Sequence, residues 1–246
     1  MSSPFDYDRS PDPIRPDLVE AHRRAWERIA RPGAWLDGSE RVAVAAEVRA
    51  ALDCALCRDR KSALSPYAVS GVHDSVTTLA PSQVDAIHRI TTDAGRITGR
   101  LLAELQDVGI EDGAYVEMVG IVTQVFSIDA FHRALGLPLE PLPERQTGAP
   151  SRRRPTGAAE EGAFVPMVKP ARLDPEDRDL YGGRFTGNVI RALSLVPAEV
   201  RALRDLSAAQ YVAEPEMVRL GSSRALDRSQ IELVAGRVSA LRECFY

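Results

Sequence analysis

Apolar residues recur every three or four positions in most segments of this chain, which is the periodicity of amphipathic helices. No segment alternates convincingly between apolar and polar residues, as a strand with one solvent face would. The pattern therefore predicts an all-α protein. The expected helices cover residues 17–31, 37–54, 81–92, 93–108, 112–135, 188–193, 197–211 and 227 to the end.

One helical stretch occurs twice, and each copy ends in a cysteine. Residues 36–54 align without a gap with residues 226–244, and eight aligned positions are identical. Both copies begin with the spacing of a capping box. The pair is Asp37 with Glu40 in the first copy and Asp227 with Gln230 in the second. The repeat predicts two related helical halves and a duplicated thiol site.

Proline and glycine divide the chain into four parts. Residues 1–16 are rich in proline and aspartate and are expected to be irregular. Residues 17–137 form the first helical half. Residues 138–170 hold seven of the prolines and are expected to be a long connector without regular elements. Residues 171–246 form the second half, which is incomplete at its C-terminus.

Composition and charge exclude several classes of protein. The net charge of −4 is small and the charges are mixed, so no basic stripe exists for nucleic acid. No apolar run approaches the roughly 18 residues that cross a bilayer, and the N-terminus lacks a signal core. These features predict a cytoplasmic protein without a membrane or nucleic-acid partner. No motif for a nucleotide or another cofactor is present.

The chemistry of the first copy centres on Cys54-Ala-Leu-Cys57. In a reducing compartment such a pair is typical of redox or metal chemistry. Two cysteines at i and i+3 share a helix face, so one sulfur can react with peroxide and the other can condense with the resulting sulfenic acid. The cations Arg58, Arg60 and Lys61 would favour the thiolate.

Two other interpretations of the pair remain open. The cysteines could be small buried apolar residues. They could also bind a metal, but zinc usually needs four ligands, and no second CxxC or nearby HxxxH occurs. We therefore expect no metal. The remaining histidines, His73 and His88 among them, belong to no motif.

The second copy resembles the alkyl hydroperoxidase D and carboxymuconolactone decarboxylase superfamily, because Glu232 lies twelve residues before Cys244. The segments that resemble its long two-copy members are residues 115–120, 131–136, 164–167 and 192–197. The resemblance implies an all-helical fold and a motif of Glu, eleven residues, Cys, two residues, Cys, three residues and His. In this motif the Glu, the first Cys and the His relay protons, the second Cys attacks peroxide and the first resolves the product.

Carried onto the first copy, the resemblance makes Cys57 the attacking thiol and Cys54 the resolving thiol. The relay Glu position is Val42 and the relay His position is Lys61, and neither is a good base at neutral pH. Glu47 lies two helical turns before Cys54 and is a substitute relay candidate; the alternative is a solvated helix glutamate.

In the second copy Glu232 and Cys244 match the relay Glu and the resolving thiol. The other two motif positions would lie beyond Tyr246, so we expect this chain to be a C-terminally truncated form of a longer protein. His132, with Glu117 and Asp129 nearby, is a further acid–base candidate. A structural histidine is the alternative for His132.

These observations predict a thiol-dependent peroxidase. The resemblance implies a lipoyl or thioredoxin-type dithiol reductant as partner and assembly into homo-oligomers. Two alternatives follow from the missing relay residues. One is a lyase of the decarboxylase branch, and the other is a non-catalytic member that acts in assembly.

Overall fold

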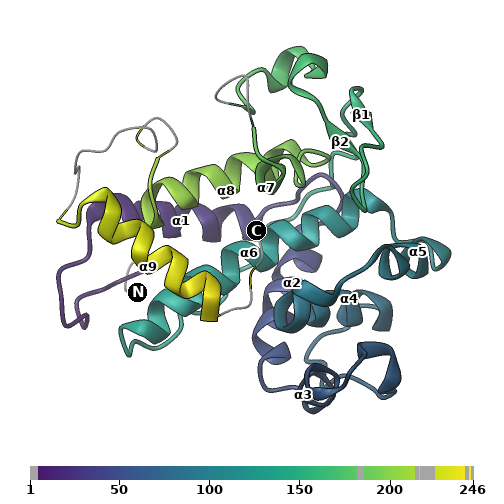
Figure 1. The fold of residues 1–246 in the computed structure, drawn as a ribbon, viewed down its shortest axis with the longest axis horizontal. Helices are drawn as coiled ribbons and strands as arrows, with labels where there is room; N and C mark the ends of the chain where they lie inside the picture. The colour runs from purple at the N-terminus through teal and green to yellow at the C-terminus, as the bar shows by residue number, and fades with distance from the viewer. Residues whose placement is uncertain (1–4, 182–185, 214–215, 217–224, 242–243, 245–246) are drawn as a thin grey trace.

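Helix α6 (Asp112–Ala134) runs through the middle of the molecule and organises its core (Figure 1). The computed structural model describes residues 5–181, 186–213, 216, 225–241 and 244. Within these residues α6 packs against α1 (Pro16–Ala30), α2 (Gly38–Ala51), α4 (Pro81–Asp93) and α8 (Pro197–Gln210). The protein is all-α, as the sequence predicts.

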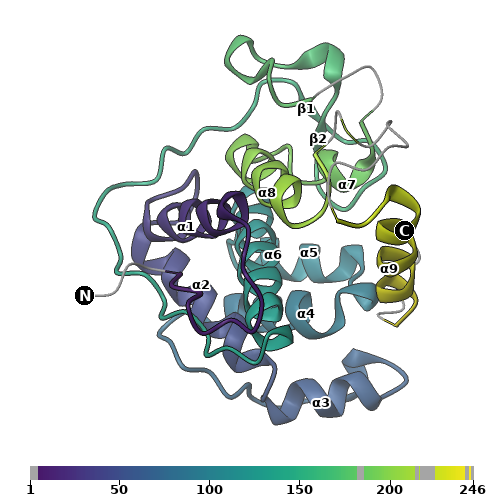
Figure 2. The ribbon, with the colours of Figure 1, turned by 90° about the vertical axis from the view of Figure 1, so that its left-hand side faces the viewer.

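The remaining elements are short or peripheral. They are α3 (Ala55–Ser62), α5 (Gly99–Asp107), α7 (Asn188–Arg191), α9 (Arg228–Leu241), four 3-10 turns, η1 (Pro66–Ala68), η2 (Ala94–Arg96), η3 (Pro170–Arg172) and η4 (Pro175–Asp177), and the strands β1 (Ala158–Ala159) and β2 (Met167–Val168). Figure 2 shows α3 at one edge of the molecule, beside α2 and α4, and α9 at another.

The helix boundaries follow from local chemistry. Both predicted capping boxes are formed: Asp37 Oδ1 accepts from Glu40 N at 2.9 Å, and Asp227 Oδ1 accepts from Gln230 N at 2.9 Å. Gly109 and Gly136 follow α5 and α6 with φ of +83° and +69°, a conformation that favours glycine after a helix.

Three sequence expectations need correction. Helix α2 ends at Ala51 rather than at Cys54, and the two cysteines lie at the start of a separate helix, α3. Residues 93–108 are divided into η2 and α5. The connector is not wholly irregular, because β1 and β2 pair antiparallel, with Ala158 opposite Val168.

The two copies of the repeat lie in different surroundings. Helix α2 is packed in the core, where Val48 is 1% exposed. Helix α9 has no buried residue among those described, and the aligned Val238 is 53% exposed. Sequence similarity between the copies therefore does not extend to equivalent packing. Phe245 and Tyr246 lie outside the described residues.

A buried charge cluster ties α2, α6 and α8 together. The Arg41 guanidinium donates to Glu117 Oε1 and, at 2.9 Å, to Glu199 Oε1. Glu199 also accepts from Gln124 Nε2 at 3.0 Å. Burial and the nearby Glu199 charge raise the pKa of Glu117 against the lowering effect of Arg41.

Helix α6 is also long and apolar enough to cross a membrane by length and composition alone. In this structure 61% of the most apolar 18-residue stretch of α6 is buried inside the protein. That burial is typical of the core helix of a folded domain, and Glu117, Gln124 and Asp129 on α6 are all paired with partners in the protein interior.

Candidate functional site

The two sulfurs of the CxxC lie at the N-terminus of α3. Cys54 is the N-cap residue, with extended backbone (φ −66°, ψ 126°), and Cys57 follows in the first turn. Helix α4 packs against α3, and residues 63–80 connect the two helices over the sulfurs. Within this connection Val69 packs on the cysteines.

Two histidines complete a compact group of four side chains, which we call the thiol–imidazole cluster: Cys54, Cys57, His73 and His88. His73 Nδ1 lies 3.5 Å from each of the two sulfurs. His88 Nδ1 lies 3.2 Å from Cys57 Sγ. The four donor atoms all lie within 4.8 Å of one another.

Each imidazole is held from behind by a carboxylate. His88 Nε2 donates to Glu47 Oε2 at 2.9 Å, and His73 Nε2 donates to Asp85 Oδ1 at 2.9 Å. These bonds fix the ring orientations, and they leave Nδ1 of each ring facing the sulfurs. The site thus contains two parallel chains, each with a thiol, an imidazole and a carboxylate.

Glu47 is the buried anchor of the first chain. Its Oε1 accepts from Ser75 Oγ at 2.7 Å, Val76 N at 3.0 Å and Thr77 Oγ1 at 2.6 Å. Burial alone would raise the pKa of Glu47, but the hydrogen bonds outweigh it and hold the pKa below its usual range. The side chain is therefore a carboxylate, and it also anchors the segment that covers the sulfurs.

Asp85 anchors the second chain and is surrounded by cations. Arg60 donates to Oδ1, and Arg89 Nε lies 2.9 Å from Oδ2. Burial acts to raise the pKa of Asp85, whereas His73 and the two arginines lower it to about 2. Of the basic residues that the sequence predicts to assist the thiols, Arg60 is the one that approaches the cluster.

The two thiols differ electrostatically. Burial acts to raise the pKa of Cys54, but backbone N–H groups of Asp74 and Cys57 and the ring of His73 lower it overall. Burial and the neighbouring Cys54 raise the pKa of Cys57 to about 12. Cys54 is therefore the more readily deprotonated of the two thiols.

The pKa values of the two imidazoles also shift in opposite directions. Burial acts to lower the pKa of His73, but the hydrogen bond to Asp85 and the neighbouring Cys54 raise it overall. Burial lowers the pKa of His88, although Glu47 partly opposes this. The pKa of Cys54 is thus lowered beside a His73 whose pKa is raised, and the pKa of Cys57 is raised beside a His88 whose pKa is lowered.

The cluster is sealed from solvent in this conformation. Cys54 is 0% and Cys57 5% exposed, and both are free thiols. The backbone N–H of Ala55 donates to Asp74 Oδ2 at 2.8 Å, which holds the covering segment to the start of α3. Residues 63–80 contribute to this burial through Val69 and His73.

Arg58 and Lys61 do not contact the cluster. Arg58 donates to the carbonyl of Asp53 at 2.6 Å, and Lys61 Nζ lies 3.4 Å from Asp93 Oδ1. They act at the ends of α3 instead. Glu232 accepts from Tyr211 Oη and pairs with Arg228, and Cys244 is exposed beyond α9. Figures 1 and 2 both show α9 away from α3, so these two residues do not join the first site.

His132 belongs to a different polar group at the N-terminal end of the chain. The distances allow one consistent chain of donors: Gln210 to His22 at 3.0 Å, His22 to Tyr7 at 2.5 Å, Tyr7 to His132 at 3.0 Å, and His132 to the carbonyl of Pro138 at 2.7 Å. Asp129 pairs with Arg49 instead of His132. His132 is thus part of a buried structural network.

Sequence reasoning missed His73 and His88 as site residues. Neither has a motif spacing to the cysteines, since the contacts to sulfur span 16, 19 and 31 residues. One usable signal existed: the segment between the CxxC and α4 is long and contains His73, and His88 follows within α4. Glu47, in contrast, was identified as a substitute relay, and it contacts the cluster through His88.

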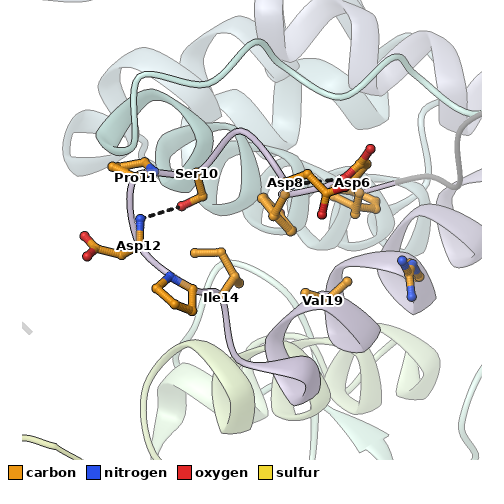
Figure 3. Close-up of a pocket in the computed structure, with 11 residues that line it drawn as sticks. Asp6, Asp8, Ser10, Pro11, Asp12, Ile14 and Val19 are labelled. Atoms are coloured by element: carbon orange, nitrogen blue, oxygen red, sulfur yellow. Dashed lines mark hydrogen bonds between the residues drawn. The ribbon is translucent and has the colours of Figure 1, made fainter.

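A surface pocket of about 610 Å³ lies elsewhere, between the N-terminal segment and α1 (Figure 3). Asp6, Asp8 and Asp12 are among its lining residues. It shares no residue with the thiol–imidazole cluster and has no cysteine or histidine in its lining. The cluster is the more reactive of the two places.

Comparison with known proteins gives no match: no family model, curated protein or solved structure matches this chain. The functional argument therefore depends on the geometry of the cluster.

Proposed function

We propose that this protein is a thiol-dependent peroxidase that uses Cys54 and Cys57 as a dithiol/disulfide pair. The observation that carries the proposal is the pair of parallel thiol–imidazole–carboxylate chains at the start of α3. Each sulfur has its own proton acceptor at hydrogen-bond range, and each acceptor is oriented by a carboxylate. This is the arrangement that nucleophilic cysteine chemistry requires.

We assign the attack to Cys54, whereas the family resemblance assigns it to Cys57. Cys54 caps α3, where the helix N-terminus and backbone N–H groups stabilise a thiolate. Cys54 gives its proton to His73 Nδ1, and the resulting thiolate attacks the terminal oxygen of a hydroperoxide while the O–O bond breaks. The alcohol leaves with the proton of the His73 imidazolium, and Cys54 becomes a sulfenic acid.

Cys57 then resolves the sulfenic acid. Its proton passes to His88 Nδ1, and its sulfur attacks Cys54 Sγ. The hydroxide leaves as water with the proton that His88 accepted, and the disulfide forms. Two thiols have then lost two electrons, and the peroxide has become alcohol and water. A lipoyl or thioredoxin-type dithiol returns two electrons and two protons.

The covering segment, residues 63–80, determines access in this proposal. Hydrogen peroxide is small, but a protein-borne dithiol is not, so reduction requires the segment to open. The segment is held closed by hydrogen bonds to Glu47 and between Ala55 and Asp74, by the bond from His73 to Asp85, and by arginines that donate to the carbonyls of Ala63 and Val69. Exchange with the reductant therefore needs only this part of the chain to move.

The test is peroxide consumption by metal-free chain with a lipoyl or thioredoxin-type donor, with mass spectrometry of the cysteines. The expected result is a Cys54–Cys57 disulfide and turnover that Cys54→Ser and Cys57→Ser each abolish. Cys244→Ser is the matched control and keeps full activity, because Cys244 is exposed and outside the cluster. Cysteines that stay reduced in mild peroxide would overturn the proposal. A small-molecule lyase activity retained in Cys57→Ser would favour the decarboxylase-like alternative.

A further inference from the structure

The four donor atoms of the thiol–imidazole cluster have the arrangement of a metal site, which goes beyond the proposed peroxidase chemistry. We propose that the reduced chain binds one Zn²⁺ ion through Cys54 Sγ, Cys57 Sγ, His73 Nδ1 and His88 Nδ1. The ion is structural, because four protein ligands leave no open position for substrate.

The distances agree with a zinc tetrahedron. Bonds of about 2.3 Å to sulfur and 2.0–2.1 Å to nitrogen give tetrahedral S···N edges of about 3.5 Å. Three of the four S···N separations in the cluster are 3.5, 3.5 and 3.2 Å. All six pairs of donor atoms lie within 4.8 Å, so one ion can contact all four. Any pair that lies farther apart than a tetrahedral edge closes by a small side-chain movement when the ion binds.

The second layer of the site is also suited to a cation. A histidine ligand usually donates its other N–H to a carboxylate, which fixes the tautomer and makes the ligand more basic. His73 donates to Asp85 and His88 to Glu47, so both Nδ1 lone pairs face the sulfurs. The two carboxylates are themselves held by other hydrogen bonds and ion pairs.

The donor set selects the metal. Two thiolates and two imidazoles in a tetrahedral arrangement suit Zn²⁺, whereas Mg²⁺ and Ca²⁺ prefer oxygen ligands. Two thiolates also neutralise the charge of the ion, so the buried complex carries no net charge of its own. The zinc-loaded chain has both sulfurs committed to the metal, and we expect it to react with peroxide more slowly than the metal-free chain.

The experiment is a titration of the full chain, kept reduced with a phosphine and without peroxide, first with Zn²⁺ against a chelator and then with Co²⁺. The expected result is one Zn²⁺ per chain. Co²⁺ should give the strong visible bands of a tetrahedral ion together with thiolate-to-cobalt charge transfer. Asp85→Asn should lower Zn²⁺ affinity about 10- to 100-fold, because His73 loses its anchor.

Cys57→Ser should weaken the thiolate charge-transfer bands of bound Co²⁺, and Cys244→Ser should leave binding unchanged. Far-ultraviolet circular dichroism of each variant separates loss of a ligand from loss of the fold. A wild-type chain that gives only the weak bands of octahedral Co²⁺, or a Cys57→Ser chain that binds Zn²⁺ as tightly as the wild type, would overturn the inference.

The two proposals fail separately. Zinc binding is measured without an oxidant, and peroxide consumption is measured on metal-free chain. A chain that binds Zn²⁺ but consumes no peroxide refutes the peroxidase and keeps the metal site. A chain that consumes peroxide but shows no tetrahedral Co²⁺ refutes the metal site and keeps the peroxidase.

Discussion

His88 donates a 2.9 Å hydrogen bond to Glu47, although the two residues are 41 positions apart in the chain. Both side chains are buried, and they join α2 to α4 directly behind Cys57. Through this bond a residue outside the CxxC controls the orientation of a group that touches sulfur. The same bond contributes to both proposals, since it sets the His88 tautomer.

Replacing Glu47 with Gln tests that role. The amide keeps the shape of the side chain but removes the charge that stabilises a protonated His88. We expect peroxide turnover by metal-free chain to fall about 100-fold, the lower end of the usual range for acid–base groups. The matched control is Glu104→Gln on α5, whose side chain pairs with Arg100 at the surface. Equal turnover in the two variants would show that Glu47 only supports the fold.

Gly120 on α6 should not tolerate a larger side chain. A Cβ at this position would overlap the side chain of Glu199, which is bound to Arg41 and cannot move freely. We expect Gly120→Ala to lower the free energy of unfolding by about 1–3 kcal/mol, despite the better helix propensity of alanine. Gly95→Ala is the control, because nothing lies within 4 Å of its Cβ position. Chemical denaturation of both variants measures the difference.

Arg41 is expected to be the most sensitive arginine in the core. Arg41→Met leaves Glu117 and Glu199 buried without their cation, and such a change costs about 3–5 kcal/mol. Arg31→Met removes an exposed pair with Glu27 and should cost less than about 1 kcal/mol. Thermal unfolding of the two variants should separate them clearly. Similar losses in both would mean that the buried cluster is not needed for stability.

Stability should fall in mild acid because of His22. Burial, with a smaller contribution from His132, lowers the pKa of His22 from 6.5 to about 4. Between these values the unfolded chain takes up a proton that the folded chain does not, so stability is present above pH 6.5 and is lost as the pH falls toward 4. From pH 8 to pH 5 the loss is roughly 2 kcal/mol.

The measurement is urea denaturation of wild type and His22→Gln at both pH values. The variant lacks this titrating group, so its stability should change less between pH 8 and pH 5. An identical change in the two chains would contradict the assignment. The other titrating groups are common to both chains and cancel in the comparison.

The fold was predictable from sequence because helix signals are local. The capping boxes at Asp37 and Asp227 lie where the sequence places them. The break between α2 and α3 was missed because residues 52–54 contain no proline or glycine. The short pairing of β1 with β2 involves two residues on each side and leaves no periodic pattern to detect.

The sequence predicted the two cysteines of the site but not its two histidines. Cys54 and Cys57 are neighbours in sequence and could be recognised together. His73 and His88 reach the sulfurs through tertiary packing of α4 and its preceding segment, which no local pattern encodes. The family resemblance, the dithiol reductant, the truncated C-terminus and the homo-oligomer stay predictions.

Residues 63–80 contain little regular structure, and they are held by His73 at the sulfurs, Asp74 at α3, the bonds to Glu47, and arginines that donate to the carbonyls of Ala63 and Val69. Metal coordination through His73 would therefore stabilise a segment with few apolar contacts of its own. Amide hydrogen exchange in that stretch should slow when the ion binds and quicken when it leaves, while α6 keeps its protection in both states. The local stability of residues 63–80 would then report whether the sulfurs of Cys54 and Cys57 hold a metal ion.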